Sequence, residues 1–190
     1  MMFAYTLKQM KTASVLLLVF TVITGMIYPI IVTVLAQFLF HWQANGSLIQ
    51  RDGQIIGSAL IAQSFTRPEY FWGRPSLNSM GSNLAAGNPD LLSAVKERIK
   101  TLHNSDMNNQ TLIPVDLVTA SGSGLDPDIS PQSALYQVHR IARERKVSDN
   151  EMISLINQLA MHSACNILGE PRVNVLTLNL ALDRLHHKDT

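Results

Sequence analysis

The chain has 190 residues, of which 46% are hydrophobic and 15% charged, and its formal net charge is +1. After residue 40 it carries 13 Lys/Arg and 14 Asp/Glu, a balance that excludes a nucleic-acid-binding surface built on net positive charge. The single cysteine, Cys165, excludes an intrachain disulfide. Because Cys165 lies among apolar residues, we interpret it as core packing rather than as a reactive thiol.

Residues 12–40 form one uncharged run of 29 residues, and 17 of these are Leu, Ile, Val or Phe. As a helix the run is about 44 Å long, which exceeds the roughly 30 Å hydrocarbon core of a bilayer. A cleaved signal peptide is the alternative, and Val34-Leu35-Ala36 resembles a cleavage site. Signal peptides, however, have apolar regions of only about 7–15 residues. We therefore expect a retained transmembrane helix, with a kink at Pro29.

The flanking charges predict the orientation of this helix. Lys8 and Lys11 precede the run, no acidic residue does, and the first charges after it are Arg51 and Asp52. The positive-inside rule then places residues 1–11 in the cytoplasm and residues 41–190 outside it, which is the periplasm in a bacterium with two membranes.

Residues 47–65, "SLIQRDGQIIGSALIAQSF", read as a hairpin around Asp52-Gly53, a dipeptide typical of positive-φ turns, with Leu48-Ile49 and Ile55-Ile56 on either side. Residues 66–89 then form a long segment without clear periodicity that contains the consecutive aromatics Tyr70, Phe71 and Trp72. Three consecutive aromatics cannot all face one core, so we expect at least one to be exposed or to bind another subunit. Arg74, held extended before Pro75, is a candidate to bind a carboxylate or carbonyl there. The alternative is that two aromatics pack inward and Arg74 forms an internal salt bridge.

Helical periodicity predicts the remaining elements. We expect a helix from Asn88-Pro89 to about Leu102, a short strand over residues 112–120, and a helix from Ser130-Pro131 to Arg145. A further helix begins at Ser148, where Ser148 and Glu151 form a capping box. Residues 173–185 fit a strand or a helix, and we favour a helix capped by Asn174. The order of elements indicates a single α+β domain after the transmembrane helix.

Arginines gather at the end of the helix that begins at Ser130: Arg140, Arg143 and Arg145, followed by Lys146. This cluster suits the negative end of a helix dipole. We interpret it as a solvated face rather than as a basic binding patch.

The sequence contains no Walker A, GxSxG, HExxH, CxxC or EF-hand motif, and its six histidines are scattered, so we expect neither catalytic residues nor a metal site. The loop "SGSGLDPDISP" could cradle an anion before a helix, but two aspartates would oppose a phosphate. We favour a packed turn or a subunit contact formed by Gly122, Ser123, Gly124 and Asp126. Asp126 and Asp128 could be acid–base partners, although Asp-Pro-Asp more often forms a turn, and we expect both to be structural.

Several segments, in order, resemble one known family: the apolar run, "GSALIAQSF", "YFWGRPS", "GSNL", "IPVDLVTASGSGLDPDISPQSALYQVHRIARER" and "LGEPRVNVLTLNLALD". The chain resembles the C chains of Kdp-type potassium-transporting ATPases over essentially its whole length. It departs from the family pattern at "NSMGSNL", where a second glycine is usual.

The resemblance implies a non-catalytic subunit of a high-affinity potassium uptake pump in the bacterial inner membrane. Its implied partners are a channel-like potassium-translocating subunit, a P-type ATPase catalytic subunit and a small accessory membrane subunit. It further implies a catalytic chaperone that raises the ATP affinity of the catalytic subunit, with ATP contacted only jointly with that subunit. The phosphorylation motif DKTGT is absent from this chain, so this is not the phosphorylated subunit.

Two other hypotheses remain open at this point: a membrane-anchored extracytoplasmic enzyme that uses Asp126 or Asp128, and a nucleotide-binding co-subunit. For the pump subunit, the candidate partner-interface residues are Tyr70, Phe71, Trp72, Arg74, Gly122, Ser123, Gly124 and Asp126.

Overall fold

The computed structural model describes residues 2–51, 53–75, 81–162 and 169–186, and the chain divides into two compact units, Met1–Leu48 and Ile49–Thr190. Some positions singled out in the sequence lie outside the described residues, among them the last residue of "YFWGRPS" (76) and the first of "LGEPRVNVLTLNLALD" (168), and three further features. These three are Asp52, Cys165 and the beginning of "NSMGSNL" (residues 78–80).

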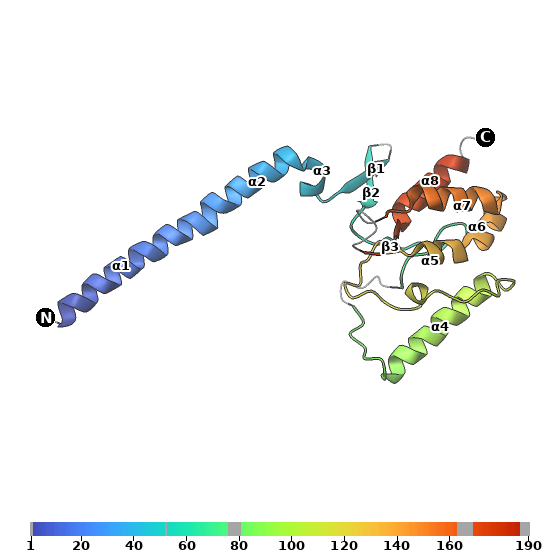
Figure 1. The fold of residues 1–190 in the computed structure, drawn as a ribbon, viewed down its shortest axis with the longest axis horizontal. Helices are drawn as coiled ribbons and strands as arrows, with labels where there is room; N and C mark the ends of the chain where they lie inside the picture. Colours follow the sequence, from blue (N-terminus) through green and yellow to red (C-terminus); the bar gives the residue numbers. More distant parts are fainter. Residues whose placement is uncertain (1, 52, 76–80, 163–168, 187–190) are drawn as a thin grey trace. The chain divides into compact units, whose positions relative to one another are not determined.

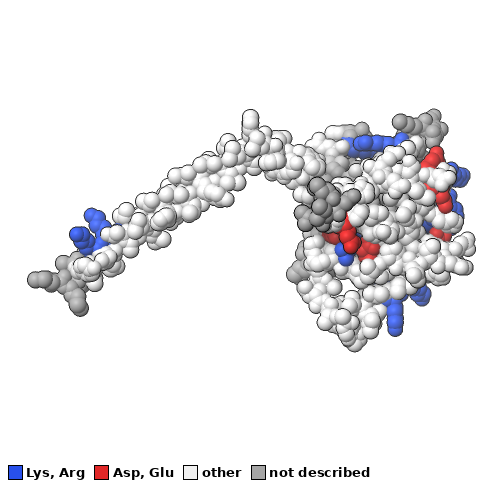
Figure 2. All heavy atoms as spheres, viewed as in Figure 1, with Lys and Arg blue, Asp and Glu red and all other residues white. Residues whose placement is uncertain are grey.

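The first unit is a long apolar helix followed by a short one (Figure 1). It consists of α1 (Met2–Val22), a π-helical segment η1 (Ile23–Ile27), α2 (Tyr28–Leu39) and α3 (His41–Ala44). Residues 5–39 are long and apolar enough to cross a membrane, and none of the most apolar stretch is buried against the rest of the protein. Figure 2 shows a helix surface without charge except for basic residues near its N-terminal end.

The helix accommodates Pro29 through the π-helical segment that ends two residues before it. Within this segment the N–H of Tyr28 donates to the carbonyl of Ile23, five residues earlier. Proline has no N–H to donate, so one carbonyl in the preceding turn has no helical hydrogen-bond donor. A π-helical turn pairs each N–H with the carbonyl five residues earlier and therefore changes which carbonyl lacks a donor. The hydroxyls of Thr21 and Thr24 donate to carbonyls four residues earlier, so neither presents an unpaired hydroxyl on this apolar surface.

The second unit begins with the predicted hairpin. Strands β1 (Leu48–Arg51) and β2 (Gln54–Ser58) form a two-stranded sheet. Gly53 between them has φ +77°, a conformation that glycine adopts without steric cost. A second small sheet joins β3 (Asp128–Ile129) to β4 (Val173–Asn174), antiparallel, with Asp128 opposite Asn174 and Ile129 opposite Val173.

All but one of the described helices of the second unit begin where the sequence places their caps; the exception is the third in chain order, which begins inside the helix expected from Ser130 to Arg145. These helices are α4 (Pro89–Ser105), α5 (Pro131–Tyr136), α6 (Val138–Arg145), α7 (Asp149–Leu159) and α8 (Val175–His186). The side chains of Asn88 and Ser130 cap α4 and α5, and Ser148 with Glu151 forms the full capping box of α7. The carboxylate of Glu151 accepts bonds from the backbone and hydroxyl of Ser148, which lower its pKa.

The C-terminal segment is a helix, as favoured from the sequence. The side chain of Asn174 accepts a hydrogen bond from the N–H of Thr177 at 3.1 Å, and α8 follows. Leu178 and Leu182 lie one helical turn apart and are both buried. The apolar residues of this segment fit the period of a strand as well as that of a helix, and the cap at Asn174 distinguishes the helix from the strand.

The prediction of a strand over residues 112–120 is wrong. This segment contains a short 3-10 helix, η2 (Val115–Leu117). The carboxylate of Asp116 accepts hydrogen bonds from the N–H of Ser130, at 2.8 Å, and from the hydroxyl of Ser133. These bonds hold the segment to the start of α5, and a side-chain anchor of this kind overrides the β propensity of isoleucine and valine.

Two apolar clusters form the core of the second unit. The larger one gathers residues from α5 to α8, β3 and β4, with Phe71 among them. The smaller one contains Leu102, Leu117, Val118 and Tyr136 and attaches α4 to the remainder of the unit. In Figure 1, α4 accordingly lies apart from the group formed by α5, α6, α7 and α8.

Candidate functional site

Residues 67–75, which we call the aromatic loop, are bound through their backbone by two amide side chains. The N–H of Phe71 donates to Oδ1 of Asn179 at 2.8 Å, and Nδ2 of Asn179 donates back to the carbonyl of Phe71 at 3.0 Å. Gln137 binds Trp72 in the same two-way manner, at 2.8 and 3.0 Å. The two amide side chains thus form the hydrogen bonds to the N–H and C=O groups of the loop that a neighbouring β-strand would otherwise form. They hold the loop in place although it is not part of a sheet.

Gln137 also explains why the helix expected from Ser130 to Arg145 is divided. It lies between α5 and α6 with φ −91° and ψ −5°, and its Nε2 donates to the carbonyl of Ser133 as well as to Trp72. Gln137, at the junction of α5 and α6, therefore holds the aromatic loop through its side chain.

Arg140 of α6 is the most deeply buried charge in contact with the loop, with 2% of its surface exposed. Its guanidinium donates to the carbonyls of Pro68 and Tyr70 and to Oε1 of Gln137, and it lies 4.1 Å from the ring centroid of Trp72. Burial lowers the pKa of Arg140 to about 10, so the group remains charged at neutral pH. The interpretation of this arginine as part of a solvated face is wrong, because carbonyls of the loop take the place of water around its guanidinium.

Arg145 forms a second attachment at the other end of α6. It donates to the carbonyl of Glu69 and to the carboxylate of Asp183, both at 2.8 Å, and lies over the ring of Tyr70 at 4.8 Å. The hydroxyl of Tyr70 donates to Asp183 at 3.3 Å. Asp183 therefore ties α8, α6 and the aromatic loop together.

The predicted interface residues of the loop have different surroundings. Phe71 is fully buried in the larger core cluster, whereas Tyr70 and Trp72 are half-buried. Arg74 donates to the carboxylate of Asp126 at 3.1 Å and to the carbonyl of Ala120 at 3.3 Å, which is the internal salt bridge considered as the alternative. Arg74 thereby joins the aromatic loop to the Gly/Ser loop, two motifs that the sequence presents separately.

The Gly/Ser loop, residues 121–128, forms a tight turn that uses its own backbone donors. The N–H groups of Gly124, Leu125 and Asp128 donate to side-chain oxygens of Ser121, Ser123 and Asp126 respectively, at 3.0 to 3.1 Å. Gly124 has φ +71°, whereas Gly122 is exposed and has open space where a side chain would be. Donors that are already paired cannot also cradle an anion, so the geometry favours a packed turn.

Asp128 contributes to the sheet rather than to an open site. Its carboxylate accepts from Nδ2 of Asn174 at 3.1 Å and pairs with Arg172 at 3.0 Å. Burial nevertheless raises the pKa of Asp128, more than the bond from Asn174 and the charge of Arg172 lower it. Both aspartates of the Asp-Pro-Asp step are thus engaged in structural contacts.

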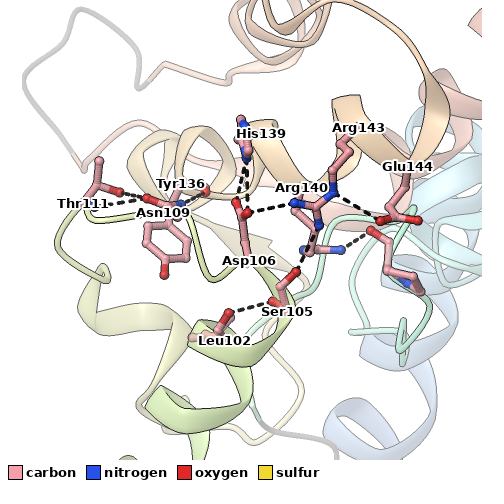
Figure 3. Close-up of polar contacts among 11 residues, drawn as sticks. Leu102, Ser105, Asp106, Asn109, Thr111, Tyr136, His139, Arg140, Arg143 and Glu144 are labelled. Atoms are coloured by element: carbon pink, nitrogen blue, oxygen red, sulfur yellow. Dashed lines mark hydrogen bonds and ion pairs between the residues drawn. The ribbon is translucent and has the colours of Figure 1, made fainter.

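A further polar cluster attaches the end of α4 to α6 (Figure 3). Asp106, only 3% exposed, accepts from Arg143 at 3.1 Å and lies 3.1 Å from Nδ1 of His139. Burial and the charge of Asp106 both raise the pKa of Tyr136 nearby. In the sequence Asp106 belongs to a polar break between elements, and no local pattern distinguishes it from a solvated aspartate.

Within the part of the chain that the structure describes, no three His, Cys, Asp or Glu side chains come together in a way that could hold a metal ion. The surface of the second unit in Figure 2 carries scattered charges of both signs rather than one extended patch. The arrangement provides a rigid loop and a rigid turn joined by Arg74, which is a geometry suited to presenting a surface.

Comparison with known proteins matches residues 10–184 to the family model "K+-transporting ATPase, c chain". The "Potassium-transporting ATPase KdpC subunit" of Methylococcus capsulatus is 52% identical over 188 residues, covering 94% of this chain and 99% of the relative. Proteins of the same description from Herpetosiphon aurantiacus and a Janthinobacterium species are 50% and 49% identical, covering 94% and 92% of this chain and 97% of each relative.

Proposed function

Because the chain belongs to the KdpC family, the c chains of K+-transporting ATPases, we propose that it is a non-catalytic, membrane-anchored subunit needed to assemble and stabilise a potassium uptake pump. The observation that carries this proposal is the extent of the match. It spans the apolar helix and the α+β unit alike, at about half identity over nearly the full length.

The apolar helix is the proposed membrane anchor. Its 35 residues from Tyr5 to Leu39 are long enough to span a bilayer, and burial of its exposed apolar side chains in lipid supplies the driving force. Lys8 and Lys11 support a cytoplasmic N-terminus and an extracytoplasmic α+β unit.

Cysteine accessibility in intact cells tests this topology. In a Cys165→Ser background, single cysteines replace Thr6 and Met107, the latter being 72% exposed. A membrane-impermeant reagent should label the cysteine at position 107 and not the one at position 6. The reverse pattern would overturn the proposed orientation.

The proposed partners are a channel-like potassium-translocating subunit, a P-type catalytic subunit and a small accessory membrane subunit. The Gly/Ser loop is a proposed contact with one of them, because Gly122 and Ser123 are exposed on a turn that is rigidly held. Tyr70 and Trp72 of the aromatic loop, half-buried and fixed by arginines, form the second proposed contact.

A pair of glycine substitutions separates a partner contact from a structural role. Gly122 and Gly87 are both exposed and have no positive φ, and a Cβ added at either position would have no atom within 4 Å. Gly122→Phe and Gly87→Phe should therefore leave the thermal stability of the chain nearly unchanged. We expect Gly122→Phe alone to reduce the amount of pump that co-purifies in mild detergent. Equal co-purification of both variants would remove the Gly/Ser loop from the interface.

We further propose that the subunit raises the ATP affinity of the catalytic subunit and contacts ATP, if at all, only jointly with it. The sequence contains neither a Walker A motif nor DKTGT, which supports an effect exerted through the assembled complex. The test is the KM for ATP of the catalytic subunit measured with and without this chain. An unchanged KM would contradict the chaperone proposal without affecting the assembly proposal.

A further inference from the structure

A cleft of about 460 Å³ opens between α4 and the aromatic loop, within the second unit. Its apolar surface comes from Phe65, Trp72, Leu102 and Leu117. Trp72 is held in place by the stacked guanidinium of Arg140 and by the hydrogen bond from its Nε1 to the carbonyl of Arg67 at 3.0 Å. A cleft of this volume with a rigid aromatic wall is within the size range of small-molecule binding sites.

The two arginines that line the cleft differ in their partners. Arg74 is paired with Asp126. Arg98 of α4 is half-buried, and Nη1 of its guanidinium donates to the carbonyl of Val118 at 2.9 Å. Among the described residues no carboxylate lies within ion-pair distance of Arg98. Among the described residues only that carbonyl accepts from Arg98, so the other N–H groups of its guanidinium are able to donate to an anion in the cleft.

The other polar groups of the cleft restrict what kind of anion fits. Glu97 precedes Arg98 on α4 and also lines the cleft, and no lysine is among the described lining residues. A multiply charged phosphate would be attracted by only one guanidinium without an ion-pair partner, that of Arg98, and repelled by the carboxylate of Glu97. An anion with a single negative charge would be neutralised by Arg98 alone. The hydroxyl of Thr66 and the amide of Gln63 add neutral hydrogen-bonding groups to the same lining.

We propose that this cleft binds a small amphipathic monocarboxylate. Its aromatic or aliphatic body lies against Trp72, Leu102 and Leu117, and its carboxylate accepts hydrogen bonds from the guanidinium of Arg98. The inference does not depend on the proposed role in the pump, but it shares Trp72 with the proposed partner contact, so both hold only if the partner leaves the cleft open.

The test is a titration of the full chain in nanodiscs with 4-(trifluoromethyl)benzoate, followed by 19F NMR line broadening and corrected with empty nanodiscs. We expect saturable binding with a Kd of about 10 µM to 1 mM, as is usual for a ligand of this size. The neutral analogue 4-(trifluoromethyl)benzamide should bind at least about tenfold more weakly, because it lacks the charge that Arg98 recognises.

Two variants of α4 differ only in where they remove a positive charge. Arg98→Gln should weaken binding of the benzoate at least about tenfold, whereas Lys96→Gln, at a position outside the cleft lining, should leave it unchanged. Ala94→Phe places a ring in the cleft and should abolish binding without removing a charge. This variant decides the matter if Arg98→Gln does not fold.

The proposal is overturned if the wild-type chain shows no saturable binding, if the benzamide binds as tightly as the benzoate, or if Ala94→Phe binds normally. The same titration on the assembled pump distinguishes a free ligand from a carboxylate of another subunit. Binding to the isolated chain that disappears in the pump would show that a neighbouring subunit fills the cleft, and would exclude the free ligand.

Discussion

Replacing Arg140 should destabilise the α+β unit more than replacing any exposed arginine. We consider Arg140→Met, which keeps a long flexible side chain but removes every donor. The carbonyls of Pro68 and Tyr70, which accept from this guanidinium, would then face an apolar group. The ring of Trp72 would lose the cation stacked on it at 4.1 Å.

The magnitude follows from opposing contributions. Each hydrogen bond to a charged group contributes about 1.5–3 kcal/mol, and a desolvated cation–π contact about 2 kcal/mol. Removing a buried charge also relieves its desolvation cost of several kcal/mol. Since the partly buried carbonyls and the ring of Trp72 lose their donor and cation together, we expect a net loss of about 3–5 kcal/mol, comparable to breaking one partner of a buried ion pair. Arg140→Lys keeps the charge but loses the planar guanidinium that donates to several acceptors at once, so its free energy of unfolding should fall by about half as much as that of Arg140→Met.

Thermal unfolding of the full chain, followed by circular dichroism, measures the effect. For a unit of about 150 residues, 1 kcal/mol corresponds to about 2–4 °C, so Arg140→Met should lower Tm by about 6–20 °C. The matched control is Arg67→Met in the aromatic loop itself, where the side chain is 73% exposed, pairs with Glu69 and lies 5.7 Å from the ring of Tyr70. An exposed pair of this kind contributes less than about 1 kcal/mol.

An equal decrease in Tm for Arg140→Met and Arg67→Met would contradict this role of Arg140. Arg140 would also not be what holds the loop if Arg140→Met lowered Tm while hydrogen exchange at the amide of Trp72 stayed as slow as in the wild-type chain. In that case the arginine would stabilise the helices but not the loop.

Three further outcomes follow from other contacts. Asn179→Leu leaves the buried N–H and C=O of Phe71 unpaired and should lower the free energy of unfolding, measured by urea titration, by about 2–5 kcal/mol. A decrease below about 1 kcal/mol would contradict a stabilising role of these two hydrogen bonds. Lys146→Gly should raise stability by about 0.5–1 kcal/mol in the same assay, because Lys146 ends α6 with φ +59°, and Lys146→Ala should show no such gain. Burial alone would raise the pKa of Asp116, but the bonds from Ser130 and Ser133 hold it below the ordinary value of 3.8. The stability lost in Asp116→Asn should thus be full above about pH 4 and should shrink as pH falls through that lower pKa, and a difference independent of pH would exclude this linkage.

Local patterns in the sequence predict the elements that depend on local interactions. The caps at Asn88, Ser130 and Ser148 are confirmed because a cap bonds to backbone only two or three residues away. The hairpin at Gly53 is confirmed for the same reason, since its turn requires a positive φ at one residue. The long apolar helix follows from composition alone, because no other segment of the chain lacks charge over a comparable length.

Where local preference meets a distant contact, the prediction from sequence fails. Residues 112–120 have the composition of a strand, yet Asp116 is bound to the start of α5, and the segment becomes a 3-10 helix. Arg140 reads as one of several solvated arginines, since nothing within a few residues of it shows that carbonyls near position 70 will surround it.

The sequence by itself therefore determined the family, the apolar helix, the starts of the capped helices and the α+β class. Only the tertiary structure decided how the aromatic loop is held, which arginines are buried, and that Arg74 joins the loop to Asp126. The bonds responsible link residues far apart in the chain, with a separation of 108 positions for Phe71 and Asn179 and 65 for Trp72 and Gln137. Such contacts form only when packing of the core has offset the entropy of closing those long loops, and no local pattern records which distant groups then meet.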